Sequence, residues 1–192
     1  MAVQPKAYLT SEEYLETERT ATYKSEYYQG EVFAMAGAGN NHNIITSNLI
    51  ISIGSFLRGK GCTVYPSDMR LHIPENGLYT YPDVMVTCGK KEFLDEKKDT
   101  LTNPVLVVEV LSNSTESYDR GRKFGFYRSI PTLREYLLVD SQRVSAERYL
   151  KNESGIWELH DSPGLGGALR LDSIDCELLL SDLYEGTEDL RP

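Results

Sequence analysis

The stretch VLVVEVLSNST, residues 105–115, has the pattern of a buried central strand that contains one carboxylate. Aliphatic residues surround Glu109 on both sides, and such a continuous apolar run is typical of a strand covered on both faces. A carboxylate in that position loses hydration worth several kcal/mol unless a partner or a metal ion compensates. Two interpretations remain open: Glu109 faces solvent near the edge of a sheet, or it has a function.

A second carboxylate enters an apolar run at YPDVMV, residues 81–86. Asp83 directly follows Pro82, and a Pro-Asp pair also begins many ordinary strands and turns. If this strand pairs with residues 105–112, we expect Asp83 and Glu109 to lie on one face at adjacent strand ends. Two carboxylates about 4 Å apart repel by about 4 kcal/mol at an effective dielectric constant of 20. A divalent cation removes that repulsion, and oxygen ligands favour Mg²⁺ or Mn²⁺ over zinc.

The segment TESYDRGRKFGFYRS, residues 115–129, is predicted to be a helix that follows the Glu109 strand. Asp119 and Lys123 are four residues apart and share a helix face, which Tyr127 continues. As an exposed ion pair they would contribute only a few tenths of a kcal/mol. Because the helix comes directly after the strand, Lys123 can instead reach back to the metal site. The arginines of this helix form either a phosphate-binding patch or a solvated face: Arg120, Arg122 and Arg128.

Three upstream positions also admit both a structural and a functional interpretation. Glu26 and Glu31 flank Gly30, where they form either the polar face of a hairpin or part of a site. His42 begins a helix after GAGNN, and a lone histidine there is more often a structural hydrogen-bonding residue than a ligand. For Glu26 and Glu31 the two interpretations are about equally favoured, and the other two histidines, His72 and His160, carry no spacing signal.

The rest of the pattern predicts few helices and many strands. Thr10 and Glu13 form a capping box for a short helix, and Ser114 or Thr115 is expected to cap the helix at 115–129. A strand pair is expected around Gln29-Gly30, and apolar positions 45, 49, 53, 56 and 57 define one face of a second helix. The remaining expectations are strands at 62–73 and 78–87 joined by PENG, a surface loop at 90–99, a buried strand at 135–140, a hairpin at 144–161, and a short strand and helical turn near 180–184.

This order has too few helices for a doubly wound sheet, so the expected class is α+β. We expect one mixed central β-sheet flanked by helices, within a single domain over residues 1–192 whose core spans about residues 10–185. The net charge of −9 argues against tight nonspecific coating of DNA but allows a local basic groove.

The three cysteines are too few and too scattered for a disulfide framework and lack zinc-site spacing, so a reduced cytoplasmic setting is expected. No run of about 20 apolar residues predicts a membrane span. The N-terminal residues MAVQPKAYLT lack the apolar core of a signal peptide.

The chain resembles the PD-(D/E)xK nuclease superfamily and, more narrowly, the Uma family of restriction-endonuclease-like proteins. The segments that carry the resemblance are YKSEYYQGEVFAMAG, HNIITSNL, SDMRL, YPDVMV, VVEVLSNST, DRGRKFGFY and REYLLVD. They occur in the order of the family and cover most of the chain. The resemblance implies a restriction-endonuclease-like core that hydrolyses DNA phosphodiester bonds with Mg²⁺ or Mn²⁺.

The resemblance also implies roles for individual residues. Asp83 matches the motif aspartate and Glu109 the acidic residue of the second half-motif, while the carbonyl of Val110 can join the metal shell. The motif lysine would fall at Leu111, so its role is expected to have moved to Lys123. Glu26 resembles an additional acidic residue that can hold a second metal or a water. Three further candidates lie in family segments, with roles that the resemblance does not define: His42, Asp68 and Asp119.

Three functions remain open. The first is a magnesium-dependent endodeoxyribonuclease, for which a homodimer is reasonable because cutting both strands of DNA requires two sites. The second is a catalytically inactive nuclease fold that binds nucleic acid or protein, which Leu111 and the acidic net charge favour. The third is a metal-dependent enzyme that acts on another phosphate ester, since a fold alone does not determine function.

Overall fold

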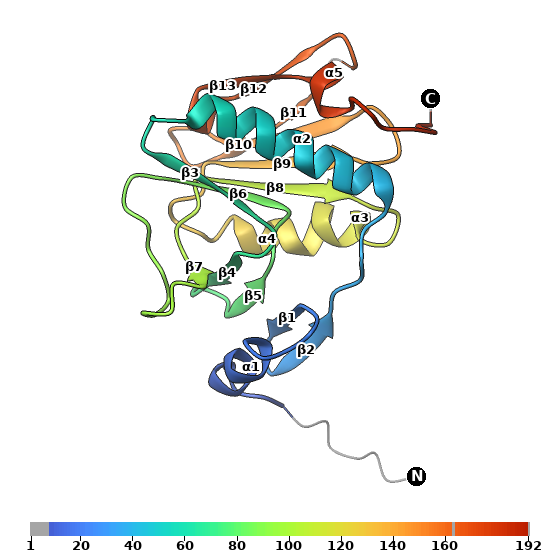
Figure 1. The fold of residues 1–192 in the computed structure, drawn as a ribbon. Helices are drawn as coiled ribbons and strands as arrows, with labels where there is room; N and C mark the ends of the chain where they lie inside the picture. Colours follow the sequence, from blue (N-terminus) through green and yellow to red (C-terminus); the bar gives the residue numbers. More distant parts are fainter. Residues whose placement is uncertain (1–7, 163, 192) are drawn as a thin grey trace.

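A six-stranded mixed sheet forms the centre of the molecule (Figure 1). The computed structural model describes residues 8–162 and 164–191. The strand order is β11-β10-β9-β8-β6-β3, in which β8 runs parallel to β9 and antiparallel to β6. Every residue of β8 and β9 is buried, which confirms the predicted central strand. The bounds are β3 Cys62–Pro66, β6 Val84–Cys88, β8 Leu106–Leu111, β9 Glu135–Asp140, β10 Ala146–Lys151 and β11 Trp157–Asp161.

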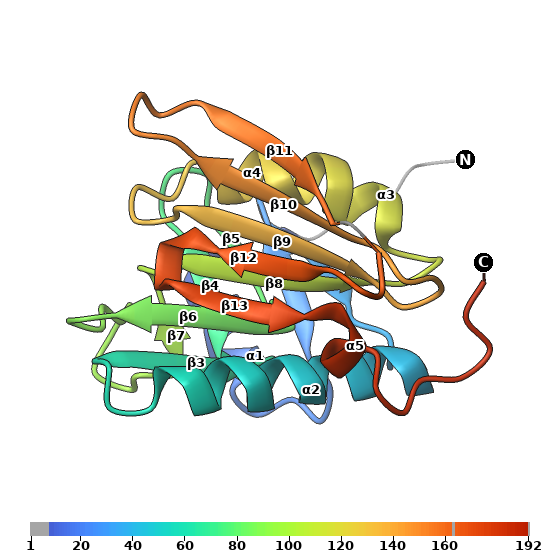
Figure 2. The ribbon, with the colours of Figure 1, turned by 90° about the horizontal axis from the view of Figure 1, so that it is seen from above.

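One face of this sheet is covered by α2 (Asn40–Leu57) and by a separate strand pair, β12 and β13 (Figure 2). The helix buries a stripe at the predicted spacing, consisting of Ile45, Leu49, Ile53 and Leu57. Val108 and Val110 of β8 face the same layer. The chain ends with two strands, β12 (Ala168–Leu171) and β13 (Cys176–Leu179), where one was expected, followed by α5 (Leu180–Leu183).

The opposite face of the sheet packs against the helical segment that follows β8. This segment is interrupted, because α3 (Glu116–Tyr118) and α4 (Phe124–Tyr127) are separated by a π-helical turn over Asp119–Lys123. Thr115 is the N-cap residue of α3, one of the two predicted positions, but its side chain makes no capping hydrogen bond. Strand alternation places Val107 and Leu111 on this face. Glu109, which lies between them in the strand, therefore faces the helical segment.

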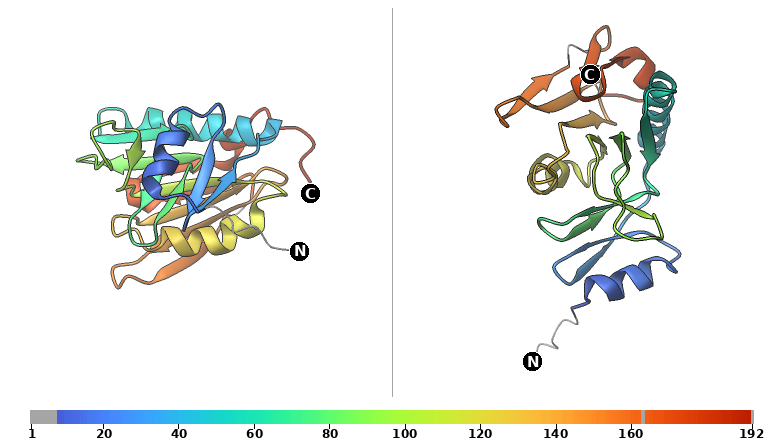
Figure 3. Two further views of the ribbon diagram at one scale, coloured as in Figure 1. Left: turned by 90° about the horizontal axis from the view of Figure 1, so that it is seen from below. Right: turned by 90° about the vertical axis from the view of Figure 1, so that its left-hand side faces the viewer.

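A second sheet of five strands, in the order β2-β1-β5-β4-β7, was not expected. It carries the predicted hairpin, in which Gln29 and Gly30 both adopt positive φ angles, as a tight turn requires. α1 (Ser11–Glu18) packs on this sheet and has the predicted capping box of Thr10 and Glu13. Figure 3 shows α1 and this hairpin at the end of the molecule away from β12 and β13. The bounds are β1 Ser25–Tyr28, β2 Glu31–Ala34, β4 Arg70–Ile73, β5 Leu78–Thr80 and β7 Thr100–Leu101.

The predicted strands at 62–73 and 78–87 are each divided between the two sheets. The first is split into β3 and β4, and the second into β5 and β6. Pro66 ends β3 and Pro82 lies in the gap before β6, where the missing N–H of proline weakens a continuous strand ladder. The PENG turn still joins β4 to β5, as predicted. The divided strands bring residues from both sheets towards the same region.

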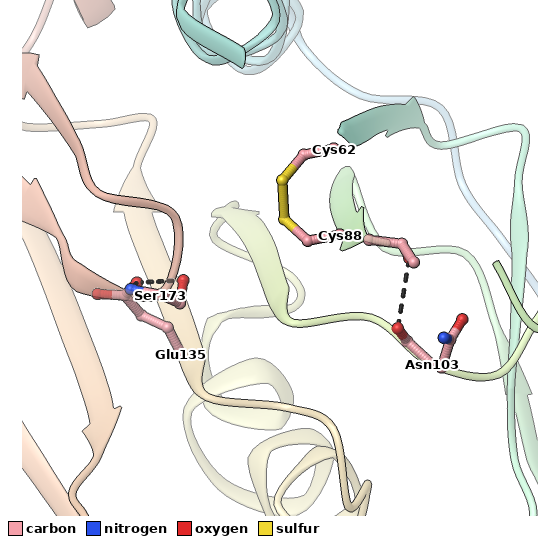
Figure 4. The surroundings of a disulfide bond; sticks show 6 residues. Cys62, Cys88, Asn103, Glu135 and Ser173 are labelled. Carbon is pink, nitrogen blue, oxygen red and sulfur yellow. Dashed lines mark hydrogen bonds between the residues drawn. A yellow bond between two sulfur atoms is a disulfide. The ribbon is translucent and has the colours of Figure 1, made fainter. Parts of the chain in front are cut away.

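Cys62 and Cys88 form a disulfide between β3 and β6 (Figure 4). Antiparallel pairing places the two residues directly opposite each other, with Cα atoms 4.0 Å apart. The expectation that the cysteines remain reduced is therefore wrong, and the argument for a cytoplasmic setting loses that support. Spacing along the chain could not reveal a pair that only the register of two strands creates. In the described part of the chain, no helix is long and apolar enough to cross a membrane.

Candidate active site

The ammonium group of Lys123 lies among three carboxylates. Its Nζ is 2.9 Å from Oε1 of Glu109, 3.3 Å from Oε1 of Glu26 and 3.5 Å from Oδ1 of Asp119. The side chains of Lys123, Glu109 and Asp119 are 6%, 5% and 4% exposed. Asp119 and Lys123 are therefore not the exposed ion pair that their spacing also allowed, and Glu109 does not face solvent.

The π-helical turn helps to position this lysine. It releases backbone groups from the regular α-helical ladder, and the carbonyl of Asp119 accepts a hydrogen bond from the Tyr136 hydroxyl at 3.0 Å. Both ends of the turn, Asp119 and Lys123, are buried. Tyr127 continues the inward face and donates a hydrogen bond to Oε1 of Glu109 at 2.6 Å. The predicted face of Asp119, Lys123 and Tyr127 is thus present, with an altered helical geometry.

Glu26 enters the cluster from the second sheet. Its Oε1 accepts a hydrogen bond from the Thr80 hydroxyl at 2.5 Å, and its Oε2 accepts one from the Tyr118 hydroxyl at 3.3 Å. Thr80 and Tyr118 were not identified from the sequence. Thr80 lies on a strand whose sheet was not expected, and no motif marks Tyr118, so neither residue carried a signal.

Asp83 lies beside Glu109 through the pairing of β6 with β8, which sets Val84 opposite Val108. Its Oδ2 accepts a hydrogen bond from the backbone N–H of Val110 at 2.7 Å. The Nε2 atom of His42, in the first turn of α2, is 3.2 Å from the same oxygen. The buried Nδ1 of His42 has no hydrogen-bond partner among the described residues.

The cluster carries more negative than positive groups. Burial raises the pKa of Glu109 to about 8, with Asp119 and Asp83 adding to the shift and Lys123 opposing it. Burial also raises the pKa of Asp119. Burial lowers the pKa of Lys123, but the surrounding acidic groups outweigh that effect, so its pKa stays well above the ordinary value and the side chain stays charged. A proton or an added cation would relieve the remaining negative charge.

The donor set is compatible with a hard cation. The hydrogen bonds within the described residues leave Oδ1 of Asp83 and Oε2 of Glu109 without a donor. Over residues 8–162 and 164–191, however, no group of three His, Cys, Asp or Glu side chains converges as a ready metal site. Mg²⁺ keeps several waters and binds through one or two carboxylates, so the two free oxygens of Asp83 and Glu109 fit it.

The other two candidate acids are Asp68, between β3 and β4, and Glu31, the first residue of β2. Asp68 is highly exposed, and its Oδ1 is 2.6 Å from Nζ of Lys24. Glu31 pairs with Tyr28 across the β1–β2 hairpin. The structure therefore gathers Glu26, Asp83, Glu109, Asp119, Lys123, Tyr127 and His42, and does not bring Asp68 to them.

The three arginines of the predicted basic patch differ from one another. Arg120 pairs with Glu116 at 2.9 Å and also with Glu147, so two carboxylates offset its charge. Arg122 and Arg128 are exposed and form no ion pair within the described residues. Only these two remain available to attract phosphates.

The family model "Uma2: Putative restriction endonuclease" matches residues 11–181. The chain belongs to the Uma2 family. Two proteins of Synechocystis sp. are similar to this Uma2 chain, and both are described as uncharacterized. One, sll1609, is 43% identical over 164 residues, covering 85% of this chain and 93% of its own. The other, slr1290, is 39% identical over 180 residues, covering 93% of this chain and 92% of its own.

The fold of this Uma2 protein also matches a solved structure. A crystal structure of "a putative nuclease belonging to DUF820" from Anabaena variabilis superposes with a TM-score of 0.76. The match covers 92% of this chain and 97% of that one at 17% sequence identity. The predicted α+β, restriction-endonuclease-like fold is thereby confirmed.

Proposed function

We propose that this Uma2 protein is a metal-dependent endonuclease that hydrolyses DNA phosphodiester bonds. The observation that carries the proposal is the buried ammonium of Lys123, held 2.9 Å from Glu109, with Asp83 directly before the adjoining strand β6. An ammonium and two neighbouring carboxylates are the groups that such a reaction uses. The family match and the nuclease fold support the same conclusion.

The metal shell is proposed to consist of Asp83, Glu109 and the carbonyl of Val110, with Glu26 as a further acidic ligand for Mg²⁺ or Mn²⁺. A bound divalent ion lowers the pKa of a coordinated water and offsets the charge that develops on a phosphate. The protein holds these groups in place before any substrate arrives. Tyr127 fixes Oε1 of Glu109, and the N–H of Val110 fixes Oδ2 of Asp83.

Lys123 is proposed to act on the attacking water or on the charged phosphate. Its ammonium is a donor, so it can orient a water oxygen or neutralise a phosphoryl oxygen without binding the metal. Lys123 takes the place of a lysine at position 111, where Leu111 is buried in the core. The flexible stem of a lysine allows the same charge to be supplied from the helical segment.

A catalytically inactive binding module is the second candidate. The observation that favours it is that Lys123 already contacts three carboxylates, which would have to share it with a substrate. Under this alternative the protein binds nucleic acid without hydrolysing it, and the cluster serves stability alone.

Cleavage of plasmid DNA separates the two candidates. Purified protein should nick or linearise plasmid with Mg²⁺ or Mn²⁺ and should be inactive in EDTA. Asp83→Asn and Lys123→Ala should each abolish cleavage, whereas Arg19→Ala, which changes a distant surface ion pair, should not. Lys123→Arg serves as a second variant that keeps the charge if Lys123→Ala folds poorly. Wild-type cleavage by folded Lys123→Ala would refute the mechanism.

The same proposal extends to the assembly. Cutting both strands of a duplex requires two sites, so we propose that the form acting on duplex DNA is a homodimer. Analytical ultracentrifugation with duplex DNA tests this. A single protein chain per duplex during double-strand cleavage would contradict it.

A further inference from the structure

Arg122 lies over two aromatic rings beside the carboxylate–lysine cluster. The centre of its guanidinium is 5.0 Å from the ring centroid of Tyr28 and 5.4 Å from that of Phe126. The two ring centroids are 4.8 Å apart, and the ring planes are inclined by 39°. Both rings are partly buried against the core, whereas Arg122 is exposed. We call these three residues the stacking platform.

The stacking platform continues directly from the proposed active site. Tyr28 lies two residues after Glu26 on β1, and alternation puts both side chains on the same face of that strand. Arg122 adjoins Lys123, and Phe126 follows Lys123 by three residues in the helical segment. Strand β1 of the five-stranded sheet and the helical segment after β8 therefore each carry one residue of the proposed active site and, close to it, one or two residues of the stacking platform.

Among the described residues, no carboxylate forms an ion pair with Arg122. Arg120, two residues earlier, is offset by Glu116 and Glu147, but Arg122 forms no ion pair with any residue in the described ranges. Its guanidinium instead rests on the faces of the rings as a cation–π contact. A guanidinium is planar, so it can stack on a base, and it carries N–H groups for a phosphate.

We propose that Arg122, Tyr28 and Phe126 bind an unpaired nucleobase of a single-stranded or locally opened DNA. The inference rests on the proposed function, because it places the strand beside Lys123. Proteins that bind single strands combine positive charge with stacking surfaces, and every base has a face to stack. Bases in an intact duplex are already stacked, so a duplex must open before it can use the platform. If the site bound only phosphates, the charge of Arg122 would be needed, but the rings of Tyr28 and Phe126 would not.

The competing explanation is that the two rings merely close the edge of the core. Under it, Arg122 attracts phosphates and the bases contribute nothing to binding. The two explanations differ in their dependence on bases, which can be removed without changing the charge of the strand.

The first test compares three ligands by fluorescence anisotropy in EDTA: a labelled oligothymidylate, an abasic strand of equal length, and a duplex. The thymidylate strand should bind about tenfold more tightly than the abasic strand, since stacking on an aromatic side chain contributes about 1–3 kcal/mol per base. It should also bind more tightly than the duplex. Equal affinity for the thymidylate and abasic strands would overturn the platform, as would tighter binding of the duplex or no binding to any strand at low salt.

The second test uses matched variants. Arg122→Ala and Arg128→Ala each remove one positive charge from an exposed arginine on the same helical segment that lacks an ion pair among the described residues. Arg122→Ala should weaken thymidylate binding about tenfold, whereas Arg128→Ala should change it by less than about threefold, since only the former loses stacking. Arg122→Lys, which keeps the charge and lacks the plane, should behave like Arg122→Ala. Equal losses for Arg122→Ala and Arg128→Ala would overturn the proposal.

The rings have their own control. Phe126→Leu and Tyr28→Leu should weaken thymidylate binding and leave the weaker binding of the abasic strand unchanged, whereas Tyr23→Leu, at an exposed tyrosine outside the platform, should affect neither. Circular dichroism identifies any variant that unfolds, and Arg122→Lys then remains decisive. Because all binding is measured in EDTA, a protein without cleavage activity can still confirm the platform, and an active nuclease can still lack it.

Discussion

Glu109 is tolerated within an apolar strand because residues that lie near it in the fold, though not in the sequence, supply an ion pair and a hydrogen bond. Lys123 and Tyr127 both contact its Oε1, and both come from the segment that follows the strand. Removing one partner from a buried ion pair leaves the other charge without compensation, which is far more costly than losing an exposed pair. The side chain of Glu109 is therefore coupled to Lys123 in stability as well as in the proposed reaction.

Lys123→Met should lower the free energy of unfolding by about 3 kcal/mol in the absence of metal at pH 9, where Glu109 is ionised, because the buried carboxylates of Glu109 and Asp119 lose their counter-charge. Adding Glu109→Gln should restore part of the loss. Urea denaturation monitored by circular dichroism measures both. Arg128→Met, which removes an exposed cation, is the control and should change stability by less than about 0.5 kcal/mol. If Lys123→Met is as stable as the wild type, the charge of Lys123 does not stabilise the surrounding acidic groups.

His42 is expected to position Asp83. Its Nε2 contacts the same oxygen as the N–H of Val110, which leaves the other oxygen of Asp83 for a ligand. His42→Ala should weaken Mn²⁺ binding at least tenfold, in line with the roughly 10–100-fold effect of groups that orient metal ligands. His42→Gln can place an N–H donor near the same oxygen and should retain most of the affinity. Calorimetry that finds equal affinity for His42→Ala and the wild type would exclude this role.

At the scale of elements, the sequence patterns correctly predicted features that depend on interactions between residues close together in the chain. The Thr10–Glu13 capping box, the Gln29-Gly30 turn and the buried stripe of α2 each depend on residues within a few positions of one another. The Cys62–Cys88 disulfide and the second sheet depend on pairing between distant strands, which no local window contains. The π-helical turn is also invisible to periodicity, because its hydrogen bonds depart from the spacing that the pattern assumes.

α1 is held to the segment before β7 by a surface ion pair with a defined pH dependence. Hydrogen bonds from Arg19 lower the pKa of Asp99 to about 2 from an ordinary value of 3.8. A carboxyl group with a lowered pKa stabilises the fold above its ordinary pKa, and that contribution is lost as the pH falls through the folded value. Because Asp99 is 33% exposed, solvent screening reduces the contribution to about 1 kcal/mol.

Arg19→Ala should therefore lower the free energy of unfolding by about 1 kcal/mol between pH 5 and 7, and the difference from the wild type should shrink as the pH falls towards 2 and vanish below it. Thermal unfolding at a series of pH values measures this difference. Arg58→Ala provides a control, since this exposed arginine has no ion pair among the described residues. A difference for Arg19→Ala that stays constant down to pH 2 would show that the arginine acts through packing.

At the scale of the whole molecule, the candidate site joins two sheets. Glu109 and Asp83 belong to the six-stranded sheet and its approach, while Glu26 and Thr80 come from the five-stranded sheet. The candidate residues Asp83 and Glu109 could be identified from sequence because each interrupts an apolar run. Glu26 was a candidate only through the family resemblance, and Thr80 and Tyr118 were not candidates, because only the folding of one sheet beside the other brings Glu26 and Thr80 to the segment of Tyr118 and Lys123.

The disulfide should stabilise the molecule without affecting the site. It closes a loop of 26 residues, for which chain entropy predicts about 3 kcal/mol. Cys62→Ser combined with Cys88→Ser should lower the melting temperature of the oxidised protein by several degrees and leave Mn²⁺ affinity unchanged, since Cys88 and Asp83 flank opposite ends of β6. Dithiothreitol should lower the melting temperature of the wild type and not of the double variant. A loss of Mn²⁺ affinity would show that the two ends of β6 are coupled.

The pairing of Asp119 with Lys123 does not depend on the π-helical turn between them. In a regular α-helix, residues three apart lie on one face just as residues four apart do, so deleting Gly121 and restoring regular hydrogen bonding would keep Asp119 and Lys123 as neighbours. The deletion would remove no charged group and would leave the acid beside its base. A one-residue gap between positions 119 and 123 in a related chain would therefore leave this pair intact wherever both charged residues are retained.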